Sequence, residues 1–374
     1  MEIHDDDEGR ARTQDSAMTK TSLDTYCLLG RSGLRVSPLA LGTMTFGTEW
    51  GWGADERDAR RIFDTYVARG GNFIDTANAY TGGTAEKYVG AFAENRRDRL
   101  VIATKYTATM EPTNPNSGGN HRKSLVRAVE ASLRRLRTDY IDLLFLHAWD
   151  ETTPIDELAR AFDDLVRSGK VLHMAMSNVP AWQTARLQSY AELRGTPPIV
   201  ALQIEYNLIE RTGEREMIPM AKELGMAVMP WSPLASGVLT GKYTVKDLDV
   251  GTGVGEPGGT RKNVAAAQNS LHARGISIAE VVKTLAVELE ASPAQVALGW
   301  VRHQPGITSP IVGARTLSQL DDNLAALDVE LSPDQLARLA AVSAFELGYP
   351  HEMLARDMTR AVMFGSAKVQ GLTA

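Results

Sequence analysis

Short apolar runs alternate with amphipathic stretches along most of this sequence. Between residues 54 and 69, Ile62, Phe63, Tyr66 and Val67 recur at helical spacing with charged residues between them, which predicts an amphipathic helix. The apolar runs are bounded by turn-forming residues and end in polar ones, a pattern typical of buried strands. The expected strands lie within 39–47 and at 72–75, 100–105, 142–147, 171–177, 200–205, 227–231 and 309–312.

Strand and helix patterns alternate about eight times, with short connections between them. This count predicts an α/β fold, a single (β/α)8 TIM barrel. A doubly wound open sheet is the alternative architecture. It is disfavoured because no expected strand leads into the G-x-G-x-x-G turn that dinucleotide-binding sheets use.

Three segments fall outside the alternation. Residues 25–37 form two short extended pieces joined around Gly30 and Gly33, which predicts an N-terminal hairpin that closes one end of the barrel. A long loop is expected after strand seven, at 240–276, and its glycine-rich tract at 251–259 is interpreted as a flexible lid. We expect the C-terminal extension to fold over the open end of the barrel. The expected organisation is a disordered tail at 1–24, the barrel at 25–344 and the extension at 345–374.

Composition narrows the class of protein. The 374 residues are 43% apolar and 23% charged with a net charge of -6, so a large core is available and no basic surplus points to nucleic acid. The single cysteine, Cys27, excludes an internal disulfide framework and suits a reducing compartment. No apolar run approaches the ~20 residues of a membrane span, and the N-terminus lacks the features of a signal peptide. We therefore expect a cytoplasmic protein without a membrane partner.

Several motifs of common site chemistries are missing. No two histidines lie three to five residues apart, and the pair His351-Glu352 is followed by Ala355 where H-E-x-x-H needs a histidine, so no metal site is expected. Neither a G-x-S-x-G elbow nor a G-x-x-x-x-G-K-[ST] loop occurs. Hydrolases and nucleotide-hydrolysing enzymes are disfavoured for that reason.

Three successive expected strands end in an acid, a base and an imidazole. These are Asp75, Lys105 and His147, and Tyr80 follows in the loop after the first of the three strands. The strand ends of a parallel barrel open on one face, so the four side chains are expected to meet there. A lysine ammonium near a phenol favours the phenolate, an aspartate holds the lysine charged, and an imidazole can orient a carbonyl oxygen. Such a pocket protonates a C=O group but needs a hydride from a bound nicotinamide.

The order and context of FIDTANAY, ATKY and LFLHAWD closely resemble the aldo-keto reductases, from about Leu29 to Ala344. In detail the chain resembles the branch that includes aryl-alcohol-type reductases and potassium-channel β subunits. The resemblance implies an NAD(P)H-dependent oxidoreductase on a (β/α)8 barrel, with Asp75, Tyr80, Lys105 and His147 as its catalytic tetrad. Tyr80 is then the proton donor in the reduction of an aldehyde or ketone to the alcohol, a reversible reaction.

The resemblance also implies positions that contact the cofactor. At the nicotinamide half these are Gly42, Thr43, Met44, Asp75, Ser177, Asn178, Gln203 and Trp231, the last of which stacks on the ring. The segment WSPLASGVLTGKY resembles the family's pyrophosphate loop, with Ser232, Leu234, Gly237 and Lys242 as its contacts. The segment IVGARTLSQLDDNL corresponds to the adenosine end, with Gly313, Arg315, Gln319 and Asn323.

The adenosine end departs from the best-known NADPH-dependent members. Those carry a Lys-Ser pair where this chain has Gly313-Ala314, and an arginine where it has Gln319. Arg315 is the strong cation that remains in this stretch to meet a 2′-phosphate. NADPH is favoured over NADH on that basis.

The substrate side is expected to be aromatic and apolar. Pocket walls are predicted from Trp50, Trp52, Tyr106 and Trp149, and from the extension near Tyr349, which favours carbonyl compounds with rings or aliphatic bulk. The small-molecule carbonyl substrate itself and the oligomeric state are left open. Two alternatives also stay open: a redox-sensing regulatory subunit that binds the cofactor, and a sugar or steroid alcohol dehydrogenase on the same barrel.

Overall fold

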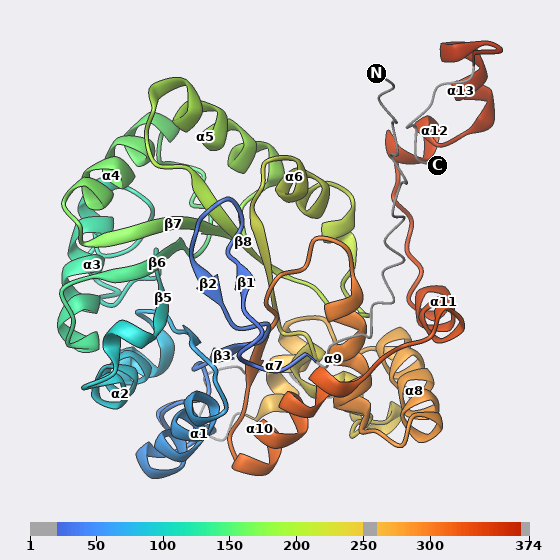
Figure 1. The fold of residues 1–374 in the computed structure, drawn as a ribbon, viewed down its shortest axis with the longest axis horizontal. Helices are drawn as coiled ribbons and strands as arrows, with labels where there is room; N and C mark the ends of the chain where they lie inside the picture. The colour runs from blue at the N-terminus through green and yellow to red at the C-terminus, as the bar shows by residue number, and fades with distance from the viewer. Residues whose placement is uncertain (1–20, 250–259, 368–374) are drawn as a thin grey trace, which may run out of the picture.

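A parallel eight-stranded sheet curves into a nearly closed barrel and confirms the predicted (β/α)8 architecture (Figure 1). The computed structural model describes residues 21–249 and 260–367. The strand order is β10-β3-β4-β5-β6-β7-β8-β9, and a bridge between Val228 and Ile307 brings the chain before β10 against β9. The barrel strands are β3 (Ala40–Gly42), β4 (Phe73–Asp75), β5 (Val101–Tyr106), β6 (Ile141–Leu146), β7 (Val171–Ser177), β8 (Ile199–Glu205), β9 (Ala227–Trp231) and β10 (Ile311–Gly313).

Helices surround the barrel, and those that pack on the sheet bury an apolar stripe against it. In α1, for example, Ile62, Phe63 and Tyr66 are buried, and Asp55 caps the helix by accepting a hydrogen bond from Asp58 N. The helices are α1 (Glu56–Ala68), α2 (Thr84–Ala93), α3 (Arg122–Leu136), α4 (Ile155–Arg167), α5 (Ala181–Arg194), α6 (Met217–Glu223), α7 (Arg261–Ala267), α8 (Ala273–Glu288), α9 (Pro293–His303), α10 (Leu317–Leu324), α11 (Pro333–Val342), α12 (His351–Leu354) and α13 (Asp357–Phe364). Of the helices in the described part of the chain, none is both long and apolar enough to cross a membrane.

The predicted N-terminal hairpin closes one end of the barrel. Strands β1 (Cys27–Leu28) and β2 (Arg35–Val36) pair antiparallel and lie over the barrel centre in Figure 1. Leu29 and Val36 are fully buried in the cluster that fills the barrel interior. Between the two strands, Gly30 has φ +56°, and a Cβ there would lie 2.3 Å from Val200 O, at the start of β8. Only glycine allows the hairpin to seat this closely on the amino ends of the strands.

The insertion after β9 is more regular than expected. Residues 240–276 were predicted to be a long loop, yet they contain α7 and the first turn of α8. Helix α8 begins at Ala273 because the His272 side chain accepts a hydrogen bond from Gly275 N and caps it. The prediction of a loop was therefore wrong for residues 261–267 and 273–276. The glycine tract interpreted as a lid lies outside the described residues.

The two ends of the chain differ in how they meet the barrel. Of the predicted N-terminal tail, residues 21–24 are described, and Leu23 among them is buried in the main core. At the other end, α11 packs on α8, while α12 and α13 project away from the barrel in Figure 1. Tyr349 is 83% exposed. The described part of the extension therefore does not cover the open end of the barrel, and Tyr349 is not a pocket wall.

Candidate active site

Lys105 lies at the centre of the polar cluster where the strands end. Its Nζ donates hydrogen bonds to Asp75 Oδ2 at 2.6 Å, to the carbonyl oxygen of Thr76 at 2.9 Å and to Tyr80 Oη at 3.2 Å. Asp75 lies at the end of β4, and Lys105 lies near the end of β5. Because these strands are parallel neighbours, the two side chains come close together. Lys105 is fully buried and Asp75 is 2% exposed. The ammonium thus has three acceptors and no access to solvent.

His147 completes the cluster from the end of β6. Its ring lies edge-on to Tyr80, with ring centroids 6.0 Å apart and planes at 78°. The backbone fixes its place, because His147 N donates to Thr107 Oγ1 at 3.2 Å and its carbonyl oxygen accepts from Asn178 Nδ2 at 2.9 Å. The structure therefore brings together the three side chains predicted from the strand ends and Tyr80 from the loop.

Burial and charge set the protonation of these groups. Burial raises the pKa of the Tyr80 phenol, and the neighbouring Lys105 ammonium offsets part of that rise. Burial would lower the pKa of Lys105, but Asp75 and Tyr80 outweigh it and hold the ammonium charged. Burial, with a further contribution from Lys105, lowers the pKa of His147 from 6.5 to about 3. At neutral pH the site thus contains a protonated phenol, a charged lysine and a neutral imidazole.

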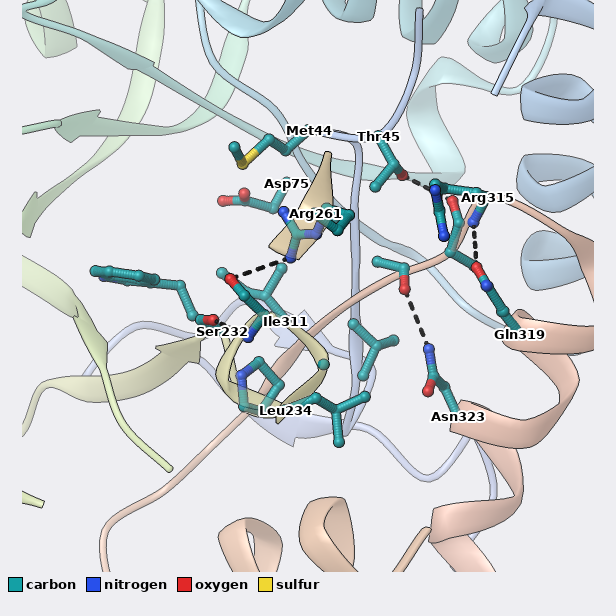
Figure 2. Close-up of a pocket in the computed structure, with 18 of the residues that line it drawn as sticks. Met44, Thr45, Asp75, Ser232, Leu234, Arg261, Ile311, Arg315, Gln319 and Asn323 are labelled. Atoms are coloured by element: carbon teal, nitrogen blue, oxygen red, sulfur yellow. Dashed lines mark hydrogen bonds between the residues drawn. The ribbon is translucent and has the colours of Figure 1, made fainter. Parts of the chain in front are cut away.

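A cavity of about 530 Å³ opens beside Tyr80 and His147 and runs toward α10. Figure 2 shows Met44 and Asp75 on one part of its wall, with Gln319 and Asn323 reaching it from α10. Many of the positions that the sequence indicated line this one cavity: Gly42, Met44, Asp75, Tyr80, His147, Asn178, Gln203, Trp231, Ser232, Leu234, Gly237, Lys242, Gly313, Arg315, Gln319 and Asn323.

Hydrogen bonds inside the wall hold several of these side chains. Gln203 Nε2 donates to Asp75 Oδ1 at 2.8 Å, so both carboxylate oxygens of Asp75 are engaged. Trp231 Nε1 donates to Asn178 Oδ1 at 3.1 Å. This bond fixes the indole against the amide and leaves the flat face of the ring available to a ligand.

Four predicted residues lie behind the cavity wall instead of on it. Lys105 and Ser177 are fully buried, as is Thr43, whose Oγ1 donates to the carbonyl oxygen of Asp75 at 3.0 Å. Tyr106 is 1% exposed, and its hydroxyl donates to the carbonyl oxygen of Asn120 at 3.4 Å. Tyr106 belongs to the main hydrophobic core and is not a substrate wall.

The other tryptophans predicted on the substrate side lie at the margin of the site. The Trp50 ring lies edge-on to Tyr80, with centroids 6.5 Å apart, and 5.6 Å from the ring of Trp52. Trp149 is half-buried and packs on the main core, and its backbone N donates to the carbonyl oxygen of Asn178. None of these three lines the cavity itself.

Arg261, which the sequence argument did not single out, lines the cavity from the first turn of α7. Its Nη2 donates to Ser236 Oγ at 3.3 Å, and its guanidinium carbon lies 5.0 Å from the centroid of the Trp52 ring. A signal was present in the sequence: Thr260 and Asn263 have the spacing of a capping box around this arginine. The glycine tract just before it concealed the start of the helix.

Lys242, Arg261 and Arg315 together make one part of the cavity cationic. Burial lowers the pKa of Lys242 and of Arg261, and the charge of Arg315 lowers both further. None of the three forms an ion pair with a carboxylate among residues 21–249 and 260–367. Three repelling cations around a cavity fit an anionic ligand, and the amino end of α10 adds a favourable field.

No group of three or more metal-ligating side chains occurs within the part of the chain that the structure describes. A polar, aromatic end near Tyr80 and a cationic end near α10 match the two halves of a dinucleotide, a flat heteroaromatic ring and phosphates.

Comparison with known proteins agrees with this geometry. The model of the Aldo/keto reductase family matches residues 38–344. Norsolorinic acid reductase stcV of Emericella nidulans is 36% identical over 333 residues, which cover 86% of this chain and 82% of the relative. Aryl-alcohol dehydrogenase [NADP(+)] of Phanerodontia chrysosporium is 36% identical over 334 residues, 85% of this chain and 86% of the relative.

A bacterial relative is similar over almost its whole length. The uncharacterized oxidoreductase YrpG of Bacillus subtilis is 40% identical over 327 residues, which cover 84% of this chain and 94% of that protein. The family match spans the barrel and the four strand-end side chains that meet in it. The chain therefore belongs to the aldo/keto reductase family, and it is an NAD(P)H-dependent oxidoreductase.

Proposed function

We propose that this protein reduces an aldehyde or ketone to the alcohol with NADPH, taking the hydride from the nicotinamide and the proton from Tyr80. The observation that carries the proposal is the contact between Lys105 Nζ and Tyr80 Oη, 3.2 Å, at the edge of a cavity that also contains Trp231. Burying a phenol or an ammonium group costs free energy. A buried pair of the two therefore contributes little to stability, and a chemical role explains it better than a structural one.

Each member of the cluster has a separate task. Tyr80, whose pKa is raised, stays protonated at neutral pH and donates its proton to the carbonyl oxygen. Lys105 then stabilises the phenolate that remains, while Asp75 keeps the ammonium charged and in place. His147 is neutral at this pH, so it is a hydrogen-bond donor that orients the carbonyl without competing for the proton.

The cavity wall supports an extended nicotinamide cofactor. Trp231 offers a stacking face, and the amides of Asn178 and Gln203 suit the carboxamide. Lys242, Arg261 and Arg315 suit phosphates, and three cations without carboxylate partners in the described residues favour NADPH over NADH. A relative named for NADP(+) supports the same choice.

The substrate class follows from the groups around Tyr80. Trp50 lies edge-on to the Tyr80 ring, and Met44, Trp231 and Ile311 add aromatic and apolar surface to the cavity. These groups favour aromatic or bulky aliphatic carbonyl compounds. A relative named as an aryl-alcohol dehydrogenase supports aromatic aldehydes as the first compounds to test.

The test is oxidation of NADPH with a panel of aromatic aldehydes, dicarbonyls and ketones, with NADH as the comparison. Tyr80→Phe should lower kcat by about 10²- to 10⁴-fold, because only the transferred proton is lost, while the Kd for NADPH changes by less than about threefold. An unchanged kcat in that variant would remove Tyr80 from the proton-donor role. Tight NADPH binding without consumption of any carbonyl would favour a regulatory, cofactor-sensing protein instead.

A further inference from the structure

Arg261 contacts two different parts of the molecule at once. It lines the cavity from α7, and its guanidinium carbon lies 5.0 Å from the centroid of the Trp52 ring. Trp52 belongs to the loop between β3 and α1, which is far from α7 in the sequence. The guanidinium is therefore held in the wall by an aromatic face that does not itself line the cavity.

The aromatic contacts continue from Trp52 to the phenol. The rings of Trp52 and Trp50 have centroids 5.6 Å apart with planes at 49°, and Trp50 meets Tyr80 edge-on at 6.5 Å. Trp50 and Trp52, the tryptophan pair, thus connect Arg261, at the cationic end of the cavity, to the phenol ring of Tyr80. Both are partly buried, so the connection is not a chance surface contact.

Arg261 needs this support because its surroundings repel it. Burial lowers the pKa of Arg261, and the charge of the nearby Arg315 lowers it further. Among the described residues, a long hydrogen bond to Ser236 Oγ at 3.3 Å holds the guanidinium. A cation over an indole face gains about 0.5–2 kcal/mol, more when the cation is desolvated, and this gain offsets part of the repulsion.

We propose that Trp52 is a positioning residue for phosphate recognition: its ring holds Arg261 ready for the cofactor's phosphates, and through Trp50 it links their binding to the position of Tyr80. The proposal rests on the proposed use of NADPH. A bound phosphate that fixes Arg261 also fixes the tryptophan pair and, through Trp50, the ring of Tyr80, and such coupling between two binding sites is reciprocal. Cofactor binding then improves carbonyl binding without direct contact between the phosphates and the carbonyl compound.

The first experiment measures binding of adenosine 2′,5′-bisphosphate by calorimetry, which requires no turnover. Trp52→Leu should raise the Kd by about two- to thirtyfold, the loss expected for a cation–π contact. Trp52→Phe should recover most of the affinity because it restores an aromatic face. Trp182→Leu is the control, since this tryptophan is 63% exposed and does not line the cavity.

A double variant separates support of Arg261 from general packing. Arg261→Met should weaken binding at least as much as Trp52→Leu, and the double variant should bind no more weakly than Arg261→Met alone. Additive losses, or an unchanged Kd in Trp52→Leu, would overturn the proposal. Urea midpoints of all variants show whether each is folded, and a lower midpoint with unchanged affinity assigns Trp52 to packing.

The second experiment tests the link to the substrate. With the best aldehyde, Trp52→Leu should raise the aldehyde KM several-fold at saturating NADPH while kcat stays within about twofold. A protein that reduces no carbonyl would refute the proposed function but leave the bisphosphate result standing. Normal turnover of the wild type, together with an unchanged bisphosphate affinity in Trp52→Leu, would refute only the role of Trp52.

Discussion

Lys105 shows how a single buried charge is sustained. The side chain has no exposed surface, and a buried ammonium without partners would lose its proton. Asp75, the carbonyl oxygen of Thr76 and Tyr80 each accept one hydrogen bond from its three N–H groups. The same contacts that stabilise the charge also prepare the phenol, so structure and chemistry depend on one set of hydrogen bonds.

Replacement of Lys105 by methionine should therefore have two separable effects. We expect kcat to fall by at least about 10²-fold, because the phenolate loses its counter-charge. The free energy of unfolding should fall by roughly 3–5 kcal/mol, since Asp75 is left as an uncompensated buried charge.

The double variant Asp75→Asn/Lys105→Met distinguishes the two effects. It should recover much of the lost stability, measured by urea unfolding, because no lone charge remains. Its kcat should stay as low as that of Lys105→Met. Recovery of turnover in the double variant would contradict the role of the ammonium.

The lowered pKa of His147 predicts that the stability of the protein decreases as the pH falls. Its pKa is about 3 in the folded protein against an ordinary 6.5, so between these values the unfolded chain binds a proton that the folded protein does not. The contribution of His147 to stability is therefore complete above about pH 6.5 and is lost as the pH falls toward 3.

Urea unfolding of the wild type and of His147→Gln, near neutral pH and at about pH 5, measures this difference. The stability of the wild type relative to the variant should fall at the lower pH. The profile of kcat/KM should likewise show no inflection near the ordinary imidazole pKa of 6.5. A clear inflection there would mean that the imidazole titrates in the active protein.

Most of the candidate site could be predicted at the residue scale because strand ends of a parallel barrel share one face. Tyr106 shows where the rule must be applied with care. It follows Lys105 directly on β5, and successive side chains of a strand point to opposite sides, so one faces the cluster and the other the helices. Arg261 could not be predicted in this way, because its place depends on an aromatic contact with Trp52, distant in sequence.

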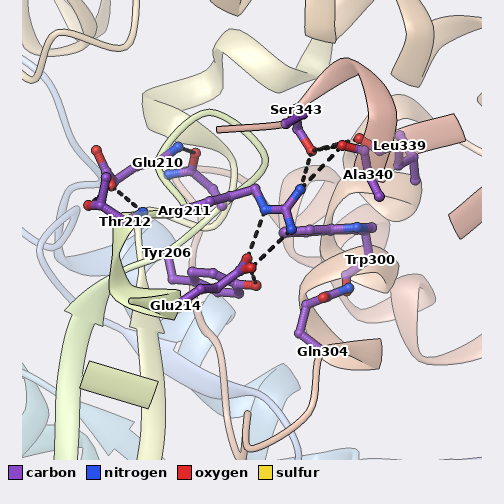
Figure 3. A network of polar contacts seen from close by, with 12 residues as sticks. Tyr206, Glu210, Arg211, Thr212, Glu214, Trp300, Gln304, Leu339, Ala340 and Ser343 are labelled. Carbon is purple, nitrogen blue, oxygen red and sulfur yellow. Dashed lines mark hydrogen bonds and ion pairs between the residues drawn. The ribbon is translucent and has the colours of Figure 1, made fainter. Parts of the chain in front are cut away.

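At the scale of elements, Arg211 joins the loop after β8 to the end of α11 (Figure 3). Its Nε and Nη2 donate to the two carboxylate oxygens of Glu214 at 2.7 and 3.0 Å, and its Nη1 donates to Ser343 Oγ at 2.9 Å. The guanidinium also lies 5.3 Å from the ring of Trp300 in α9. Three elements distant in sequence therefore share one side chain.

Arg211→Ala should lower the free energy of unfolding by roughly 2–4 kcal/mol, because Glu214 and Ser343 lose a shared, mostly buried partner. Urea unfolding measures the loss. Arg160→Ala is a matched control: its ion pair with Asp156 is exposed, so stability should change little. Equal losses in the two variants would show that burial of the Arg211 network is unimportant.

Element boundaries were predictable where the pattern was strong and failed where glycine interrupted it. The range 171–177 predicted for β7 agrees with the structure, as does 227–231 for β9. The sequence analysis missed the start of α8 because Gly275 lies in its first turn, and the low helix propensity of glycine predicts a loop there. The histidine cap outweighs that propensity, and a Cβ at position 275 would lie 2.5 Å from Ser270 O, so the close approach there requires glycine.

The barrel architecture of the whole molecule could be predicted from the alternation of strands and helices along the sequence. Few folds accommodate eight such units with short connections. The C-terminal extension could not be placed in the same way. Its apolar side chains, among them Met358 and Val362, indicate a buried helix, yet both are more than two-thirds exposed, at 71% and 83%. Periodicity predicts that a helix has an apolar face but not which surface, if any, covers it.

Removal of residues 348–374 tests whether the extension serves the active site. Within residues 348–367, the described part of the removed segment, His351 Nε2 lies 3.0 Å from Glu216 Oε1, a partly exposed pair that contributes little. Phe345, which packs near Arg211 and Arg215, is retained in the shortened chain. We therefore expect kcat and the aldehyde KM to stay within about twofold of the full-length protein. A KM that rises several-fold would mean that the extension closes over the cavity during turnover, as the sequence first suggested, because loss of a wall weakens substrate binding.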